Sequence, residues 1–284
     1  MIRKPRFYFS FHSPFSWMAS HQLERRLPDS HDVLEYIPLF EPDAQTTASI
    51  AERGIDMHYT AMSKAKHLYI LQDTKRLSAR IGLPMKWPID VDPWWVLPHH
   101  AYLAARRLGH GRELYWALSS ARWERGENIC EVDVVRRIAD SIGLDGDALA
   151  MAPANPEIRA EGMDCLEKAY LDDIFGMPYF KLGPHRFWGL DRLDDFLSAY
   201  ERSKERDRGR NKDTGKDLGQ DMSDAAAADK KAKILLDNGI LPNRPAPLDP
   251  SLVPDLDADP AAGLPTELFS LVGSYDRDSA GGCG

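Results

Sequence analysis

Aromatic and polar residues alternate near the start of the chain, and apolar residues then recur at helical spacing. Residues 6–11 (RFYFSF) show the alternation typical of a β-strand. Ser13 and Pro14 follow, and this pair favours an N-cap and the first position of a helix, which apolar periodicity extends to Pro28. Residues 33–39 (VLEYIPL) predict a second strand. The opening therefore predicts a β-α-β unit with parallel strands and a right-handed crossover.

The middle of the chain has the apolar periodicity of helices. The pattern predicts helices over residues 57–81, 97–108, 113–123, 132–142 and 155–174. Residues 82–98 hold four prolines and three tryptophans, so we expect an ordered loop there. Trp87, Trp94 and Trp95 are core candidates, although the loop that carries them is expected to overhang a cleft, where one ring is placed to stack on a planar substrate.

Strand-forming segments return after the predicted helices. Residues 178–182 and 186–188 predict a β-hairpin around a turn at 183–184. Asp191 is then expected to cap a helix that runs to about Tyr200. The whole order is β-α-β, an all-helical segment, and β-β-α.

The composition changes at residue 201. Residues 201–231 hold nine Lys/Arg and eight Asp/Glu with almost no large apolar residue, which predicts a charged, solvated linker or a frayed helix. Residues 232–284 form a tail rich in proline and acidic residues, with short apolar patches at 234–236 and 268–272.

Charge and cysteine content narrow the classes of function. The net charge of −8 and the pI near 5.6 argue against nucleic-acid binding, and no apolar run is long enough for a membrane span. His12, Pro14 and three serines interrupt the aromatic stretch near the N-terminus, which favours a strand over a secretory signal. Three separated cysteines without metal-type spacing predict a reducing, cytoplasmic setting and no metal site. His99 and His100 also lack metal partners at suitable spacing, so we expect them on the surface or in the core.

Five short segments resemble, in this order, the family of 2-hydroxychromene-2-carboxylate isomerases and kappa-class glutathione transferases, within the DsbA-like thioredoxin superfamily. They are FYFSFHSPFSW (7–17), SKAKHLYILQDTKRLSARIGLP (63–84), ARWERGENI (121–129), GMPYF (176–180) and FWGLDRL (187–193). The resemblance implies an α/β, thioredoxin-like fold whose parts, 1–56 and 175–200, flank a helical insertion at 57–174. It also implies a homodimer.

Ser13 and Ser16 stand where a thioredoxin-like oxidoreductase carries its two cysteines. Serine cannot exchange disulfides, so two-cysteine redox catalysis is excluded at this position. A helix N-terminus still offers free N–H groups and the positive end of the helix dipole, which together with the Ser13 hydroxyl favour a bound thiolate. The alternative is that Ser13 only caps its helix.

The resemblance implies glutathione as the cofactor and names residues that hold it. Met177 and a cis Pro178 would pair with its cysteinyl part, whereas the sequence alone predicts an ordinary trans turn. Gly189, Leu190 and Asp191 would hold its γ-glutamyl end. Leu190 departs from the polar residue common in the family, so it offers only backbone contacts.

Two lysines, Lys64 and Lys66, lie at the start of a predicted helix. The resemblance favours Lys66 as the partner of a carboxylate on glutathione or on an aromatic acid, and the alternative is a solvated helix face. Family pocket positions between residues 41 and 61 carry unfamiliar residues, namely Gln45, Thr60 and Ala61.

Three functions remain open at this point. The first is a glutathione-dependent isomerase of an unsaturated aromatic keto acid, in which Ser13 stabilises the thiolate. The second is a kappa-type glutathione transferase acting on a small electrophile through the same residues. The third is a non-catalytic thioredoxin-like binding module. A protein thiol in place of glutathione is the rival mechanism, although we expect Cys130, Cys165 and Cys283 to be dispensable.

Overall fold

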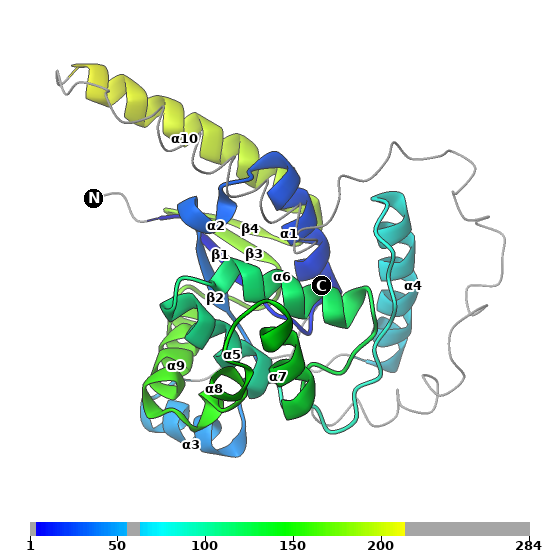
Figure 1. Cartoon of the computed structure of the whole chain (residues 1–284). Helices are drawn as coiled ribbons and strands as arrows, with labels where there is room; N and C mark the ends of the chain where they lie inside the picture. Colours follow the sequence, from blue (N-terminus) through cyan, green and yellow to red (C-terminus); the bar gives the residue numbers. More distant parts are fainter. Residues whose placement is uncertain (1–3, 56–62, 214–284) are drawn as a thin grey trace.

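A computed structural model of the protein describes residues 4–55 and 63–213, with side-chain burial through residue 208 (Figure 1). A four-stranded sheet has the order β2-β1-β3-β4. Its strands are β1 (Arg6–Phe9), β2 (Glu35–Pro38), β3 (Tyr179–Leu182) and β4 (His185–Trp188). β1 pairs in parallel with β2 and antiparallel with β3, and β3 and β4 form an antiparallel hairpin. The predicted β-α-β unit and the hairpin are therefore confirmed.

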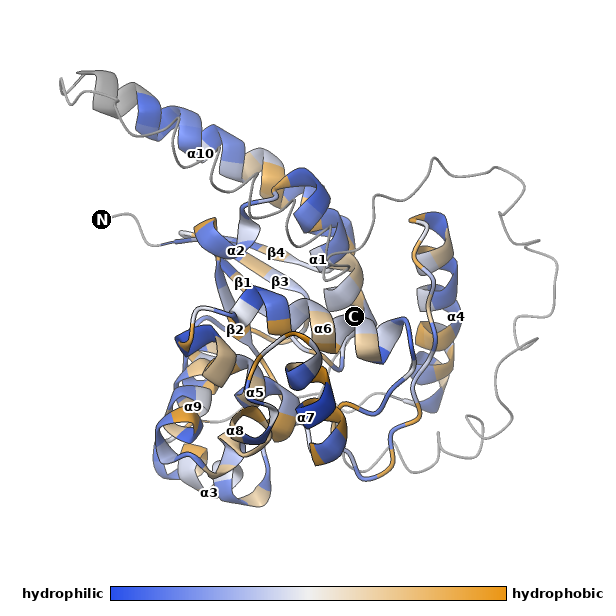
Figure 2. Ribbon diagram, viewed as in Figure 1, coloured by the Kyte–Doolittle hydropathy of each residue, from blue (hydrophilic) through white to orange (hydrophobic). Residues whose placement is uncertain are grey.

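Four helical elements connect and flank these strands. α1 (Pro14–Arg26) and the short α2 (Ser30–Val33) lie between β1 and β2. The 3₁₀ turn η2 (Leu190–Arg192) follows β4 and leads into α10 (Leu193–Asp213). Figure 1 shows α10 extending away from the sheet, and much of its length is hydrophilic in Figure 2.

The described part of the insertion between β2 and β3 consists of helices joined by loops and contains no strand. Its elements are α3 (Ala44–Glu52), α4 (Lys64–Arg80), α5 (Val96–Arg107), α6 (Gly111–Trp123), α7 (Val132–Ser141), α8 (Gly146–Ala150), η1 (Ala152–Ala154) and α9 (Pro156–Leu171). Helices α5 to α9 pack together, whereas α4 stands at the side of the molecule (Figure 1).

Several predicted boundaries differ from the structure. The strands are shorter than 6–11 and 33–39, and α3 was not predicted. The last helix begins at Leu193 and continues to residue 213, well past the predicted end at Tyr200. Asp191 lies within η2 and forms an ion pair with Arg192, so its predicted role as the helix cap is wrong. The start of the predicted helix over 57–81, Thr60, Ala61, most of the linker, the tail and Cys283 lie outside the described residues.

Aromatic side chains of β1 pack on both faces of the sheet, as the alternation in the sequence requires. The Phe7 ring stacks on Phe180 and meets Tyr36 edge-on, with centroid distances of 4.8 and 4.9 Å. The neighbouring Tyr8 faces the other side and donates a hydrogen bond of 2.5 Å to Asp172, just beyond α9. The face of the sheet that carries Phe7 therefore packs against α10 and against α5 and α6 of the insertion, whereas the other face lies towards α9.

A smaller hydrophobic cluster joins α1 to α4. Phe15, Trp17 and Met18 of α1 pack with Ile70 of α4, and Trp123 at the end of α6 completes the cluster. Partly buried Leu190 contacts both this cluster and the main core. This second cluster fixes α4 beside the start of α1.

Two adjacent histidines of α5 are fully buried. Burial, followed by the charge of Arg159, lowers the pKa of His100 to about 4, and burial lowers the pKa of His99 to about 3. Neither ring nitrogen of His100 has a hydrogen-bond partner among the described residues. The ring fits against Gly162, where an added Cβ would lie 2.4 Å from Nε2. Both histidines are therefore neutral core residues, which confirms one of the two predicted placements.

Acid is expected to destabilise the fold through His100. The unfolded chain binds a proton near pH 6.5, whereas the folded chain resists it to about pH 4, so the stabilisation is complete above pH 6.5 and is lost as the pH falls towards 4. His100→Leu should reduce the slope of unfolding free energy in that window by up to about 1.4 kcal/mol per pH unit. Urea unfolding at several pH values measures the slope, with exposed His110→Leu as the control. An unchanged slope in His100→Leu would contradict this assignment.

Candidate functional site

The turn between β1 and α1 is held by hydrogen bonds from two directions. The Nε2 atom of His99 accepts from the Phe11 backbone N–H at 3.1 Å, and its Nδ1 atom donates to the Trp95 carbonyl at 2.6 Å. Within the turn, the Ser13 N–H donates to the Ser10 carbonyl at 3.1 Å. His99 thus fixes the backbone that leads into α1, a role that sequence reasoning missed because the Phe11 N–H is 88 residues away in the chain.

Ser13 lies at the N-terminus of α1 against the strand β3. Its hydroxyl oxygen accepts from the Ser16 N–H at 3.2 Å and donates to the Met177 carbonyl across 3.5 Å. The Met177–Pro178 peptide is cis, as the family resemblance implied. The Pro178 carbonyl accepts from the Gly189 N–H at 2.9 Å. The structure therefore brings Ser13, the cis peptide and the start of η2 together, with Ser13 fully buried.

A groove of about 570 Å³ runs between α1, α4 and η2. Three predicted site residues line it, namely Lys66, Leu190 and Asp191, together with Phe15, which follows Ser13 by two residues. The rest of its lining is largely apolar and includes Tyr69, Ile70, Leu77 and Ile81. Lys64, two residues earlier and also exposed, does not line the groove.

The backbone conformation at position 189 requires glycine. Its φ of +98° is rare for residues with a side chain, and an added Cβ would lie 2.6 Å from the Asp191 carboxylate. Asp191 itself is exposed at the groove. Its carboxylate accepts a hydrogen bond of 2.8 Å from the Arg192 guanidinium. The carboxylate is therefore exposed but paired, and a cationic group of a ligand would share it with Arg192 or displace that partner.

The other side of the turn faces the insertion. The His12 ring stacks on Trp95 with a centroid distance of 4.4 Å and an interplanar angle of 16°. The Arg122 guanidinium lies over the rings of Trp95 and Trp123, at 4.6 and 4.7 Å. Arg122 also forms a bidentate pair with Asp90, at 2.7 and 2.8 Å, in which both side chains are 2% exposed. The buried pair fastens the loop before Trp95 to α6.

Comparisons with known proteins give relatives that share this architecture. The model of the DsbA-like thioredoxin domain matches residues 6–201. The chain belongs to this family. It is 29% identical over 205 residues to 2-hydroxychromene-2-carboxylate isomerase of Sphingobium xenophagum, covering 70% of this chain and 98% of that protein. An uncharacterised protein of Bacillus subtilis, YwbO, is 23% identical over 109 residues, covering 38% of this chain and 54% of that protein.

Solved structures show the same fold. A structure of 2-hydroxychromene-2-carboxylate isomerase aligns with a TM-score of 0.57 and 20% identity, covering 72% of this chain and 98% of that one. A probable DsbA oxidoreductase of Streptomyces coelicolor aligns with a TM-score of 0.51 and 16% identity, covering 71% and 89%. The resemblance inferred from the five sequence segments is confirmed, and so is the thioredoxin-like fold with its helical insertion.

The cysteines of this DsbA-like domain that the structure describes are poor nucleophiles. Cys130 and Cys165 are both buried, and burial raises the pKa of the Cys130 thiol well above its ordinary value. Burial likewise raises the pKa of Cys165 to about 11. A thiol reacts as its thiolate, so neither side chain is activated at neutral pH.

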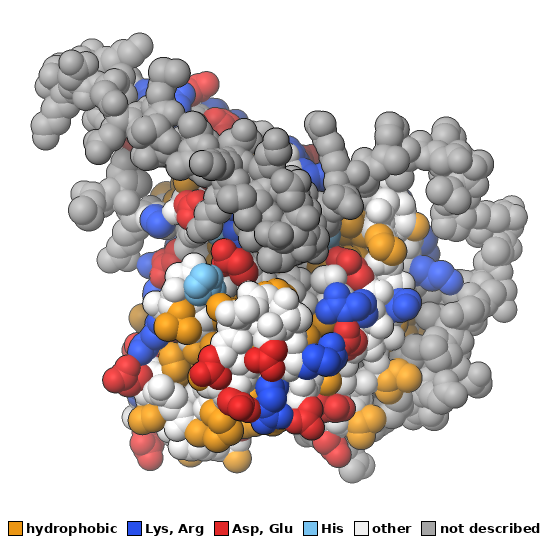
Figure 3. Space-filling view, viewed as in Figure 1, with side chains coloured by type: hydrophobic (Ala, Val, Ile, Leu, Met, Phe, Trp, Pro, Cys, Tyr) orange, Lys and Arg blue, Asp and Glu red, His pale blue; other side chains and the backbone are white. Residues whose placement is uncertain are grey.

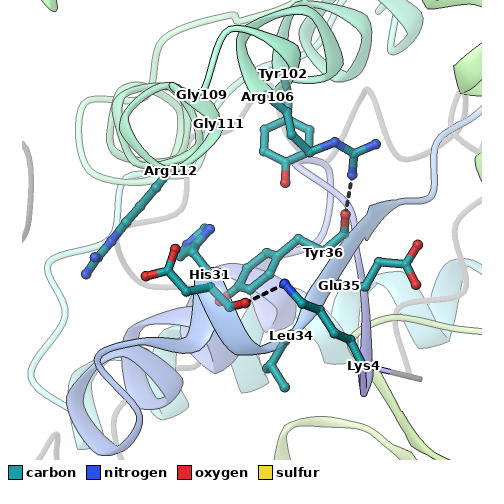
Figure 4. A pocket seen from close by; sticks show the side chains of 11 residues that line it. Lys4, His31, Leu34, Glu35, Tyr36, Tyr102, Arg106, Gly109, Gly111 and Arg112 are labelled. Atoms are coloured by element: carbon teal, nitrogen blue, oxygen red, sulfur yellow. Dashed lines mark hydrogen bonds between the residues drawn. The ribbon is translucent and has the colours of Figure 1, made fainter. Parts of the chain in front are cut away.

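A second cavity, of about 370 Å³, lies beside β2 and the ends of α5 and α6 (Figure 4). Two hydrogen bonds join residues of its lining. Lys4 donates to the Asp32 carbonyl at 2.6 Å, and Arg106 donates to the Tyr36 carbonyl at 2.7 Å. None of the predicted site residues lines it.

The described residues, 4–55 and 63–213, can be compared with the predictions on membranes and metals. No helix there is long and apolar enough to cross a membrane, and no cluster of three metal-binding side chains occurs there. On the face formed by α6, α7 and α8, basic and acidic side chains are interspersed (Figure 3). That face therefore lacks the continuous basic surface that a phosphate backbone requires.

Breaking the buried Asp90–Arg122 pair should destabilise the protein strongly. Asp90→Leu leaves an uncompensated buried charge and should lower the free energy of unfolding by about 3–5 kcal/mol. The double variant Asp90→Leu/Arg122→Met removes both charges and should recover most of that loss. Chemical denaturation measures both. The exposed pair of Glu157 and Arg107 supplies the control, since Glu157→Ala should cost less than about 1 kcal/mol. A double variant as unstable as the single one would contradict this account.

Proposed function

We propose that this DsbA-like protein is a glutathione-dependent isomerase of an unsaturated aromatic keto acid resembling 2-hydroxychromene-2-carboxylate. The observation that carries the proposal is the Ser13 hydroxyl at the N-terminus of α1, hydrogen-bonded to the backbone beside the cis Pro178. The similarity to 2-hydroxychromene-2-carboxylate isomerase, which spans 98% of that protein, supports the reaction class.

The start of α1 has the chemistry that a bound thiolate needs. The first N–H groups of a helix lack partners within the helix, and the helix dipole places partial positive charge there. The Ser13 hydroxyl adds a donor that can turn from the Met177 carbonyl towards a ligand sulfur. A thiol held at this point ionises more readily than in water, just as cysteines at helix N-termini do. Because position 13 is a serine and not a cysteine, the thiol at this point must come from a bound ligand.

Glutathione fits along the line from Met177 to the groove. The backbone of Met177 beside Pro178 is placed to pair with the cysteinyl part of the tripeptide, as an added strand pairs with a sheet edge. The exposed Asp191 carboxylate suits the ammonium group of the γ-glutamyl end. Lys66, exposed at the rim of the same groove, suits a carboxylate. Half-buried Leu190 supplies only apolar and backbone contacts between them.

The reaction needs no net consumption of the thiol. The thiolate sulfur forms a bond to the β-carbon of the conjugated ketone, and the π electrons move onto the carbonyl oxygen. The former double bond then rotates as a single bond. Elimination breaks the carbon–sulfur bond, restores the alkene and releases the thiolate. Glutathione is therefore a nucleophilic cofactor that is regenerated in each turnover.

Stoichiometry separates this isomerase from a glutathione transferase. Incubation of the protein with 2-hydroxychromene-2-carboxylate and glutathione should convert many molecules of substrate for each molecule of glutathione, with no loss of free thiol. Loss of one thiol for each molecule converted would establish a transferase. Absence of conversion together with retention on immobilised glutathione would favour a non-catalytic binding module, for which Leu190 is the supporting observation.

Ser13→Ala should remove most of the activation of bound glutathione. In the wild-type protein, we expect the thiol of bound glutathione to ionise on the order of one pH unit or more below the value of about 8.5 for a free cysteine thiol. Ultraviolet titration of the thiolate measures this pKa. Asn155→Ala removes the N-cap of α9, which accepts from the Glu157 N–H at 2.9 Å, and controls for loss of a cap elsewhere. An unshifted thiol pKa in the wild-type protein would refute the mechanism.

Lys66→Met should weaken glutathione binding more than Lys64→Met does. Both side chains are exposed on the first turn of α4, but only Lys66 lines the groove. An exposed ion pair contributes at most about 1 kcal/mol, which corresponds to about a fivefold increase in the dissociation constant for Lys66→Met. Isothermal titration calorimetry at low salt measures both variants. Equal effects of the two substitutions would place the carboxylate elsewhere.

A further inference from the structure

His12 stands out within the buried segment that carries Ser13. Every residue from position 7 to position 19 is buried except His12, which is half-buried. Its backbone N–H donates to the Ser10 hydroxyl at 3.2 Å, but its ring makes no hydrogen bond within the described residues. The imidazole is therefore a partly exposed polar group beside Ser13.

The two neighbours, His12 and Ser13, face opposite sides of the turn. The Ser13 hydroxyl bonds the Met177 carbonyl next to β3, whereas the His12 ring stacks on Trp95 of the insertion. A thiol held by Ser13 would thus have glutathione on the β3 side and His12 on the insertion side. The Arg122 guanidinium lies over the Trp95 ring, and the Trp95 carbonyl accepts a hydrogen bond from His99. Because these contacts hold Trp95, its ring fixes the orientation of the His12 ring that stacks on it.

The surroundings of His12 keep the imidazole neutral. Burial, followed by the positive charge of Arg122, lowers its pKa to about 4, although Asp90 acts in the opposite direction and His67 adds to the lowering. A neutral imidazole keeps one N–H donor at neutral pH. Such a donor can stabilise an enolate oxygen without giving up its proton, as a neutral histidine does in triosephosphate isomerase.

We propose that His12 is a catalytic residue that donates a hydrogen bond to the substrate oxygen on which negative charge develops when the thiolate adds. This inference rests on the proposed function and deepens it by giving the oxyanion its partner. Addition of the thiolate to the β-carbon moves an electron pair onto the carbonyl oxygen, and elimination returns the pair, so His12 keeps its proton throughout. A donor positioned in advance stabilises that charge most in the addition and elimination steps.

Two stable glutathione conjugates test this role without turnover. S-(3-oxo-3-phenylpropyl)glutathione contains the S–C–C–C=O unit of the thiol adduct with its carbonyl oxygen, and S-(3-phenylpropyl)glutathione lacks that oxygen. Wild-type protein should bind the carbonyl conjugate about three- to tenfold more tightly, the range that one net hydrogen bond supplies. Isothermal titration calorimetry measures both dissociation constants and that of glutathione.

His12→Phe keeps a flat ring to stack on Trp95 but removes the donor, and His12→Leu is a second variant without a donor in case the first fails to fold. Either variant should abolish the preference for the carbonyl conjugate and leave the affinity for glutathione within twofold. His12→Gln, which retains a donor, should keep part of the preference. His31→Phe is the matched control, because His31 stacks on Tyr36 at 3.9 Å in the second cavity and should leave the preference intact.

The outcomes distinguish this inference from the proposed function. A preference that persists in the folded variants without a donor, or that is missing in wild-type protein that binds glutathione, overturns the role of His12 alone. If wild-type protein binds neither glutathione nor the conjugates, the proposed function fails and the role of His12 falls with it.

Discussion

The hydrogen bonds from His99 to the turn after β1 determine where α1 begins and which way its first residues point. A buried imidazole that accepts from the Phe11 N–H and donates to the Trp95 carbonyl ties that turn to the insertion. Ser13 can then cap α1 while its hydroxyl lies against Met177. The groove, the cis peptide and the stacked His12 are all placed relative to this turn, so the site depends on the insertion as much as on the thioredoxin-like part.

The helical insertion therefore does more than cover the sheet. It supplies His99 beneath the turn, Trp95 beside it, and Lys66 on α4 at the rim of the groove. The small cluster around Phe15 and Ile70 holds α4 against α1. In the proposed reaction the thioredoxin-like part binds the thiol and the insertion faces the electrophile. This division explains why a fold that elsewhere exchanges disulfides can serve isomerisation once its two cysteines are serines.

The sequence allowed the order of strands and the start of α1 to be predicted, because alternation and the Ser-Pro pair are local signals. It did not reveal α3, of which only Thr46 and Ile50 are buried, so that its apolar pattern is weak. The charged composition beyond Tyr200 left a linker and a frayed helix as alternatives, and α10 continues as a helix to residue 213. Packing between distant elements determines which lysine lines the groove. It also determines on which side of the turn His12 lies. Composition and spacing carry no signal for those contacts.

The central claim is that the start of α1 holds the sulfur of an external thiol. A crystal structure of the protein with glutathione tests it most directly. The account predicts that the sulfur lies within hydrogen-bonding distance of the Ser13 Oγ atom, with the cysteinyl backbone paired to Met177 and the γ-glutamyl end beside Asp191. Glutathione bound elsewhere, or bound with its sulfur directed away from Ser13, would contradict it.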